Sequence, residues 1–552
     1  MNIYQVLPRL FGNINATNKP NGTIAENGCG KLNDFTPKAL TEIKNMGFTH
    51  IWYTGVIEHA TQTDYCDCGI SSDHPGVVKG KAGSPYAIKD YYDIAPDLAV
   101  DVPARMKEFE DLIDRTHKAD LKAIIDFVPN HVARQYKSDV KPPKTKDLGQ
   151  NDRSDFGFSP QNNFYYIPYQ GLTSQFDRKG YEEFPAKATG NDQFTASPTI
   201  NDWYETVKLN YGVDYQAGRI PHFNPTPDTW IKMRDILLFW SKKKVDGFRC
   251  DMAEMVPVEF WGWVILQIKA KYPHIIFIAE VYNPAEYRNY IFNGKFDFLY
   301  DKVGLYDTLR AITCNQSEAK NITSCWQSVN DIQPNMLNFL ENHDEQRIAS
   351  DFFAGDAKKA IPAMIVSALF TASPFMVYFG QEIGEPGMDA EGFSGKDGRT
   401  SIFDYWSINS IQSWVKGKFN DKAFTSEQKK LKTFYTKLLD LRLNEKAFSE
   451  GSSYDLMWQN YDNEVFNPDK QFAFMRKFEK NLVLVVVNFD DKEVSVGVNI
   501  SQHVFESLNI KPKKNAKWMD LLSGETITQT LSSDSKFNID IPKYNGVVLK
   551  IQ

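Results

Sequence analysis

The stretch Gly247-Phe-Arg-Cys-Asp251 decides the fold, because it is one of a series of short apolar runs that end in polar residues. Amphipathic segments such as Pro37–Met46 and Val102–Lys118 separate most of these runs. Alternating strands and helices predict a parallel sheet, and eight such units over this length predict a closed (β/α)8 TIM barrel of the α/β class. The predicted strands are Ile3–Leu7, His50–Thr54, Ala123–Val128, Gly247–Asp251, Ile275–Ala279, Asp297–Leu299, Met336–Leu340 and Phe375–Tyr378.

One interval, from Val132 to Pro221, interrupts this alternation. It is rich in Asn, Asp, Gly, Pro and Tyr and shows little helical periodicity. So long an irregular stretch is either a disordered insertion or a small subdomain. Its many aromatic residues favour an ordered subdomain, inserted after the third strand beside the mouth of the barrel.

The pattern changes again after the helical segment Lys429–Asn444. Gln471–Lys477, Asn481–Asn488 and Gly546–Ile551 read as antiparallel strands, with period-2 alternation in places, and predict a C-terminal β-sandwich. We therefore expect three parts: a barrel from residues 1–131 and 222–450, an inserted subdomain from residues 132–221, and a C-terminal all-β domain from residues 455–552.

Composition excludes some functions. The formal charge of −7, from 63 basic and 70 acidic residues, argues against a nucleic-acid partner. The apolar stretch Ala363–Phe379 contains Ser, Thr and Pro and reads as a buried helix and strand, so no membrane partner is expected. The opening MNIYQVLPRLFG lacks the features of a signal peptide. The compartment stays open: a cytoplasmic protein, or a periplasmic or secreted one if the chain is a trimmed mature form. Oligomeric state is left open.

The six cysteines show no metal-ligand repeat. Cys314 and Cys325 bracket a polar segment, and a disulfide between them and a pair of free thiols are equally compatible with the sequence.

Four polar segments follow predicted strands, and catalysis in a (β/α)8 barrel lies at the C-terminal strand ends. They are Asp126-Phe-Val-Pro-Asn130-His131, Gly247-Phe-Arg249-Cys-Asp251, Ile278-Ala-Glu280 and Glu341-Asn-His343-Asp344. Any one of them could be a helix cap or a structural polar residue. Four together, each at a predicted strand end, predict an active site.

The spacing within these segments has a chemical meaning. Residues two apart on a strand share a face, so Arg249 and Asp251 both point into the barrel mouth. The guanidinium would lower the pKa of Asp251 and keep it ionised, as a nucleophile requires. Glu280 closes an apolar run, where desolvation would raise its pKa and suit a proton donor. Two carboxyl groups with separated pKa values are typical of glycoside hydrolysis.

These four segments resemble, in order and spacing, the four signature regions of the α-amylase family, glycoside hydrolase family 13. The resemblance extends to Gly47–Trp52, Ser84–Tyr92, Pro374–Glu382 and Leu431–Asn444. It covers nearly the whole chain apart from much of the inserted interval.

The resemblance implies the role of each site residue. Asp251 would be the nucleophile, Glu280 the general acid/base, and Asp344 the third acid, which binds the 2- and 3-hydroxyls of the sugar. The configuration would be retained, with the carboxyls of Asp251 and Glu280 about 5–5.5 Å apart. Substrate contacts are expected from Tyr86, His131, Arg249, His343, Asp126 and Glu254.

The resemblance also implies calcium sites, and this chain departs from both. Ile220-Pro-His222-Phe-Asn224 resembles the fifth region of the family, with His222 in place of an aspartate ligand, while Asn130 matches another ligand. Calcium prefers hard anionic oxygens. We therefore expect no required cofactor, although Ca²⁺ remains possible.

The second site is a first-loop motif, Phe11–Gly22, in which Asn13, Asn15 and Asn18 would be the ligands. Lys19 replaces an asparagine of this motif, and Lys31 lies where an acidic ligand is usual. We hypothesise that lysine replaces calcium in holding this loop.

Specificity is the third departure. The Lys-His pair of typical α-amylases, and the valine that usually follows the nucleophile of oligo-1,6-glucosidases, are both absent from Asp251-Met-Ala-Glu254-Met255. Glu254 either contacts the leaving group or is a solvated helix residue.

The expected function is hydrolysis of α-glucosidic bonds, α-1,4 foremost, in starch or malto-oligosaccharides. A glucanotransferase, a trehalose-forming enzyme or an α-1,6-active glucosidase on the same machinery is the alternative, and a non-catalytic binding barrel is a remote one. Endo or exo action stays open.

Overall fold

The computed structural model describes residues 1–552 and contains an eight-stranded parallel sheet in the order β15-β14-β13-β12-β5-β2-β1-β16. A parallel bridge between Asn338 and Phe375 joins the two outer strands, and the backbone N–H of Met376 donates to the carbonyl oxygen of Asn338 at 2.9 Å. The predicted (β/α)8 barrel is therefore confirmed. Its strands are β1 (Asn2–Val6), β2 (His50–Tyr53), β5 (Lys122–Phe127), β12 (Gly247–Cys250), β13 (Ile276–Ala279), β14 (Phe298–Tyr300), β15 (Met336–Leu337) and β16 (Phe375–Tyr378).

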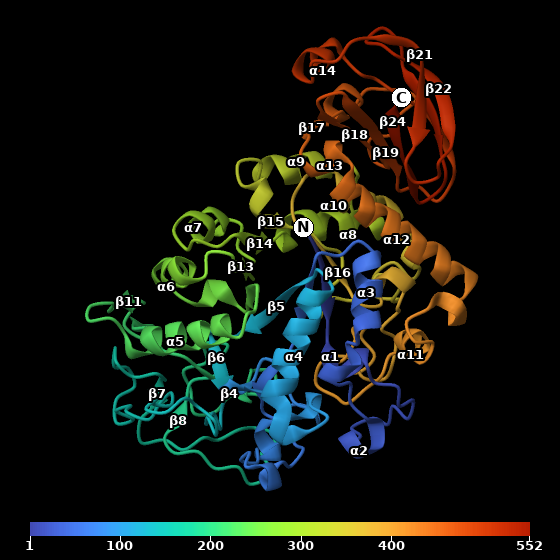
Figure 1. The fold of residues 1–552 in the computed structure, drawn as a ribbon. Helices are drawn as coiled ribbons and strands as arrows, with labels where there is room; N and C mark the ends of the chain where they lie inside the picture. The colour runs from blue at the N-terminus through green and yellow to red at the C-terminus, as the bar shows by residue number, and fades with distance from the viewer.

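Helices cover the outer face of the barrel (Figure 1). The strands are accordingly buried on both faces, which is why they read as continuous apolar runs in the sequence. Two short helices, α1 (Pro8–Phe11) and α2 (Ile24–Asn27), follow β1. The first longer helix is α3 (Pro37–Asn45), which the side chain of Thr36 caps by accepting the N–H of Ala39. The others are α4 (Arg105–Lys118), α5 (Asp228–Lys242), α6 (Val258–Lys271), α7 (Tyr287–Phe292), α8 (Asp307–Thr313), α9 (Asn321–Ser328) and α10 (Ile361–Leu369).

The segment between β5 and α5 is built of short strands and loops. Antiparallel pairs are formed by β6 (His131–Ala133) with β9 (Thr206–Lys208), by β7 (Tyr166–Ile167) with β8 (Ala186–Lys187), and by β10 (Val213–Asp214) with β11 (Ile220–Pro221). A small apolar cluster that includes Leu172 and Tyr181 packs inside it. Because β6 begins at His131, the pairing of β6 with β9 places this segment directly beside the barrel mouth.

A second, antiparallel sheet forms the C-terminal part, as predicted. Its order is β17-β18-β19-β24-β21-β22, beside a two-stranded sheet of β20 and β23. The ring centroid of Phe370 lies 5.5 and 5.0 Å from those of Phe472 and Phe474, so this sheet shares a core with the barrel. The strands are β17 (Ser452–Asp455), β18 (Gln471–Phe478), β19 (Asn481–Asn488), β20 (Val494–Val498), β21 (Lys513–Asp520), β22 (Thr526–Leu531), β23 (Phe537–Ile541) and β24 (Asn545–Ile551).

The C-terminal sheet stands at the end of the molecule remote from β7, β8 and β11 (Figure 1). It joins the barrel through α12 (Ser426–Asn444), the long helix that precedes it. No helix combines the length and the hydrophobicity needed to cross a membrane. Cys314 and Cys325 are free thiols in the structure.

Candidate active site

Three acids follow barrel strands at their C-terminal ends. Asp251 comes after β12, Glu280 after β13, and Asp344 lies in the loop after β15. The hydrogen bonds between neighbouring strands continue past the strand ends. The N–H of Asp251 donates to the carbonyl oxygen of Phe127 at 2.9 Å, and the N–H of Glu280 donates to the carbonyl oxygen of Cys250 at 3.1 Å. The backbone therefore fixes both carboxylates at the same edge of the sheet.

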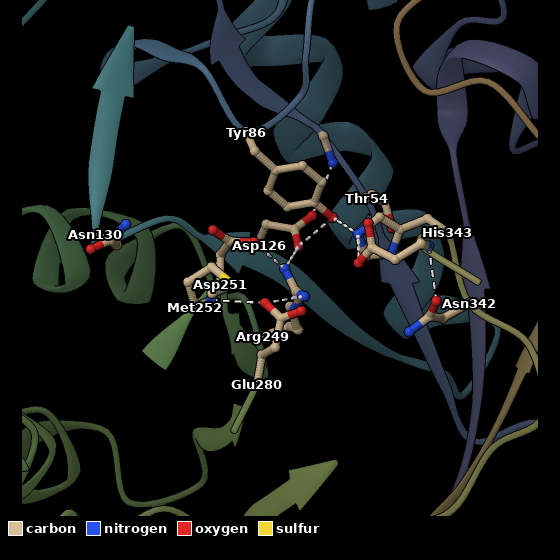
Figure 2. Close-up of polar contacts among 12 residues, drawn as sticks. Thr54, Tyr86, Asp126, Asn130, Arg249, Asp251, Met252, Glu280, Asn342 and His343 are labelled. Carbon is tan, nitrogen blue, oxygen red and sulfur yellow. Dashed lines mark hydrogen bonds and ion pairs between the residues drawn. The ribbon is translucent and has the colours of Figure 1, made fainter. Parts of the chain in front are cut away.

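Arg249 is fully buried and stands among three acids (Figure 2). Its guanidinium nitrogens lie 2.8 Å from Asp251 Oδ1, 2.7 Å from Glu280 Oε2 and 3.7 Å from Asp126 Oδ1. Its Nε donates to the hydroxyl of Tyr300 at 3.1 Å. The two terminal nitrogens of the planar Arg249 guanidinium thus hold Asp251 and Glu280 in place.

Asp251 keeps one oxygen free. Oδ1 accepts from Arg249, whereas Oδ2 is buried and has no hydrogen-bond partner. Burial raises the pKa of Asp251 well above its usual range, the charges of Glu280 and Asp344 add to this, and Arg249 opposes them. The prediction that Arg249 would hold this pKa low was therefore wrong in its net direction, because desolvation outweighs the nearby cation.

Glu280 is held from both sides of its carboxyl group. Oε2 accepts the backbone N–H of Met252 at 2.8 Å, and Oε1 accepts the hydroxyl of Tyr282 at 2.5 Å. Met252 donates from the left-handed region, with φ of 43°, so the turn after the nucleophile aims its N–H at the proposed acid.

His343 connects the third acid to Tyr86. The side-chain nitrogen of Gln5 lies 2.8 Å from His343 Nδ1, which must accept because an amide nitrogen only donates. Nε2 then carries the proton, 2.5 Å from the Tyr86 hydroxyl and 3.1 Å from Asp344 Oδ2. Burial and the charge of Arg249 lower the pKa of His343 well below its usual value, which keeps the ring neutral. Burial, followed by the charge of Glu280, raises the pKa of Asp344 to about 7.

The acids open onto a cavity of about 320 Å³. Of the predicted site residues, Tyr86, His131, Asp251, Glu280 and Asp344 line it. Burial, with a smaller effect of the Lys208 ammonium, lowers the pKa of His131 to about 3, so this imidazole is also neutral. The cavity is therefore a concave site with all three acids on its wall.

The remaining predicted residues do not line the cavity. Arg249 and His343 support it from behind, and Asp126 accepts the N–H of Gly55 at 3.0 Å next to Arg249. Glu254 accepts the N–H groups of Tyr282 and Asn283 at 3.1 and 3.0 Å. The structure thus shows Glu254 bound to the loop after Glu280, and its contact with a leaving group stays a prediction.

Sequence reasoning missed several residues of the cavity wall, among them Lys79, Trp203, Glu205 and Tyr282. Tyr282 carried a usable signal, because it lies two residues after the proposed acid on an extended segment and so shares its face. The others lie in loops without periodicity and carried none.

The calcium position beside Asn130 is filled by a lysine. The ammonium of Lys208, on β9, lies 2.5 Å from Asn130 Oδ1, 2.7 Å from Asp192 Oδ1 and 3.3 Å from the carbonyl oxygen of Met255. The side chain is buried, with 2% exposure. Three oxygens around a cation are a ligand set for calcium, but the protein already supplies the charge, so a metal ion does not fit.

His222 does not take part in this centre. It is exposed, and its nearest aromatic contact is the ring of Phe158, with centroids 5.4 Å apart. His222 therefore contributes nothing to this centre, and Lys208, on the strand that pairs with His131, provides the cation beside Asn130.

The first-loop asparagines are satisfied without a cation. Asn13 donates to the carbonyls of Asn27 and Trp406, and Asn18 donates to that of Ser407. Asn15 donates to the carbonyl of Glu26. Because the amide nitrogens face carbonyls and their oxygens accept N–H groups, a calcium ion would find no ligand cage here.

The lysine hypothesis was also wrong for this loop. Lys19 Nζ lies 2.5 Å from Glu26 at the surface, and Lys31 Nζ lies 2.5 Å from the carbonyl oxygen of Asp97. Neither ammonium lies among the amides, so hydrogen bonds from the asparagine side chains to backbone carbonyls hold the loop.

Three buried acids, Glu58, Asp90 and Asp93, also lie together, with ligand atoms within 4.8 Å of one another. Asp93 is paired with Arg105, and Asp90 accepts N–H and O–H groups. Burial and the two neighbouring charges raise the pKa of Glu58 to about 9, so it is neutral. Asp93 thus has a cationic partner, whereas Asp90 is held by neutral donors.

The family models match almost the entire chain. Residues 5–451 match the α-amylase catalytic domain, and residues 458–552 match the α-amylase C-terminal all-β domain. Among curated proteins, the chain is 25% identical to α-amylase 3 of Dictyoglomus thermophilum, over 78% of this chain and 79% of that protein. It is 21% identical to neopullulanase 2 of Thermoactinomyces vulgaris, over 99% of this chain and 77% of that protein.

Solved structures show the same fold. A noncanonic maltogenic α-amylase of Thermotoga neapolitana matches with a TM-score of 0.62 and 18% identity, covering 100% of this chain and 98% of that one. An α-amylase of Geobacillus thermoleovorans, solved with acarbose, matches with a TM-score of 0.64 and 19% identity, with the same coverage.

Proposed function

The chain belongs to the α-amylase family of glycosidases, which act on α-glucans, and from this premise we propose that it is a retaining hydrolase of α-1,4-glucosidic bonds in starch or malto-oligosaccharides. The observation that carries the proposal is the unpartnered Oδ2 of Asp251, which lies on one cavity wall with Glu280 and is oriented by Arg249. A nucleophile needs such a free lone pair, and its acid partner must reach the same bond.

The first step breaks the glycosidic bond. Asp251 Oδ2 attacks the anomeric carbon, and protonated Glu280 gives its proton to the leaving oxygen. A covalent glycosyl enzyme forms at Asp251. As negative charge leaves this carboxylate, Arg249 remains bound to Glu280, which has become the carboxylate, so the cation compensates charge on both acids in turn.

The second step hydrolyses the intermediate. Glu280, now ionised, takes a proton from water, which attacks the same carbon and releases Asp251. Two inversions give net retention of the α configuration. Asp344 and the neutral rings of His131 and His343 offer hydrogen-bond partners to the sugar hydroxyls without adding positive charge near the reacting carbon.

Timed product analysis tests the proposal. Maltoheptaose, soluble starch and isomaltotriose are incubated with the enzyme, and proton NMR follows the anomer that forms first. We expect α-anomers from the α-1,4 substrates and much slower release from isomaltotriose. Initial β-anomers would contradict double displacement, and glycosyl transfer to added glucose in preference to water would indicate a glucanotransferase.

A further inference from the structure

An ion pair on the cavity wall has no part in the mechanism above. Lys79, in the loop between β3 (Ile57–His59) and β4 (Ile88–Ile94), lies 3.0 Å from Glu205, which directly precedes β9. Both residues line the cavity that contains Asp251 and Glu280. The pair therefore joins a barrel loop to the inserted segment within the substrate site.

Glu205 has bonding capacity that the protein leaves unused. Its side chain is 5% exposed, Oε1 faces Lys79, and Oε2 is buried without a hydrogen-bond partner. An unpaired carboxylate oxygen in the protein interior is costly. Glu205 lines the cavity, and Oε2 is the carboxylate oxygen that no protein group occupies, so a small rotation of the side chain would present it to a ligand.

Lys79 supplies the matching donor. Its ammonium carries three protons, and its only ion pair in the structure is the one with Glu205. It lies over the ring of Tyr204, 5.6 Å from the centroid. A sugar hydroxyl both donates and accepts, so one hydroxyl can donate to Glu205 Oε2 while another accepts from Lys79.

The surroundings suit a sugar ring. Trp203 also lines the cavity, with its ring centroid 5.2 Å from that of His131, and an aromatic face can cover the C–H face of a sugar. The residues around Asp251 already provide partners for the attacked ring. Lys79 and Glu205 bond to none of the three acids, and Glu205 lies two residues after Trp203, whose ring contacts that of His131.

We propose that Lys79 and Glu205 form a hydroxyl clamp for a second sugar ring of the substrate, adjacent to the ring that Asp251 attacks. The proposal rests on the function proposed above. Because the two charges cancel, the clamp selects an uncharged glucose unit: a phosphorylated or acidic sugar would meet the Glu205 carboxylate. It would make the enzyme prefer substrates of at least two α-linked glucose units on the clamp side.

Two substrates separate the clamp from the catalytic centre. α-Glucosyl fluoride has one ring and a leaving group that needs little acid catalysis, so it reports on the nucleophile and the attacked-ring site. Maltotriose has further rings. For Glu205→Gln and Lys79→Met we expect kcat/KM on maltotriose to fall roughly 10–100-fold, the loss typical of a charged hydrogen bond. On α-glucosyl fluoride it should stay within about twofold, since the attacked-ring site is intact.

The matched control is Lys243→Met, which removes a lysine of similar exposure from its ion pair with Glu110 outside the cavity. It should leave both substrates unaffected. Equal losses on both substrates in the clamp variants would mean a purely structural pair, and no loss on maltotriose would mean that the pair binds no sugar. Either result overturns the clamp.

A wild-type enzyme that hydrolyses neither substrate would instead overturn the proposed function. The clamp is then tested by binding alone: maltotriose should bind Asp251→Asn roughly 10-fold or more tightly than Asp251→Asn/Glu205→Gln in calorimetry. Equal affinities would overturn it.

Discussion

Two buried cations lie near the same stretch of chain, Asp251 to Met255, and their surroundings differ in charge balance. Arg249 faces three carboxylates, those of Asp251, Glu280 and Asp126. Lys208 faces one, that of Asp192, together with two neutral oxygens. In the first centre burial and the excess of acids raise the pKa values of Asp251 and Asp344, so protons can be exchanged. In the second a single carboxylate balances the cation, and burial lowers the pKa of Lys208. The reactive centre has more carboxylates than cations, whereas in the structural centre one cation is balanced by one carboxylate.

Removing the nucleophile should break the reactive centre most severely. Asp251→Asn keeps the shape and the contact with Arg249 but cannot form the glycosyl enzyme. We expect kcat/KM on maltoheptaose to fall roughly 10⁴-fold or more, as measured by reducing-sugar release. The control is Asp246→Asn. Asp246 precedes β12 at the end of the strand away from the active site, where it pairs with His117, so kcat/KM should remain within a few-fold of wild type. Near-normal activity of Asp251→Asn would assign the nucleophile elsewhere.

Neutralising the acid should cost less and depend on the leaving group. For Glu280→Gln we expect a loss of roughly 10²–10⁴-fold on maltoheptaose, the usual contribution of general acid–base catalysis. The loss on α-glucosyl fluoride should be clearly smaller, because fluoride departs without a proton. Identical losses on the two substrates would show that Glu280 is not the proton donor.

The balanced centre should respond in stability instead. Lys208→Met removes the buried cation from Asp192, whose side chain is 27% exposed, and from Asn130. Leaving these acceptors unpaired should cost about 1–3 kcal/mol of unfolding free energy, measurable by urea titration. The wild-type Tm should not change with EGTA or with added Ca²⁺. A fall in wild-type Tm on chelation would show that a metal ion supports this fold after all.

The smallest expected effect is on the pH profile. Asp251 must be ionised to attack. Because its pKa is raised, the fall of kcat/KM on the acidic side of the pH profile (the acidic limb) should occur at a pH above the usual pKa of aspartate. Asp344→Asn removes one neighbouring negative charge, which lowers the pKa of Asp251 and should move this limb to lower pH by roughly one unit. The absolute rate will also fall, so only the position of the limb is compared. A limb that stays in place or moves upward would contradict the coupling.

The barrel strands could be predicted because they are buried on both faces and leave a continuous apolar signal. Phe375–Tyr378 coincides with β16, and the other predicted strands overlap the observed ones with small shifts at their ends. The clustering of the acids follows from the same topology. The catalytic roles and the domain boundaries, by contrast, remain predictions.

The features that could not be predicted depend on contacts between residues that are far apart in the sequence. Lys208 lies on a strand of three residues inside an aperiodic interval, so no sequence pattern connects it with Asn130. The direction of the pKa shift at Asp251 depends on how fully Arg249 and the acids are desolvated, which residue spacing does not reveal. Lys79 and Glu205 come from separate loops and meet only in the folded chain.

The lysine beside Asn130 has a kinetic consequence. A bound metal ion must be captured from solution, whereas the ammonium of Lys208 is synthesised with the chain and is always present in a one-to-one ratio. Docking of the inserted segment onto the barrel is then a unimolecular event. Its rate during refolding should depend on neither protein nor calcium concentration, and dilution cannot strip the centre of its charge.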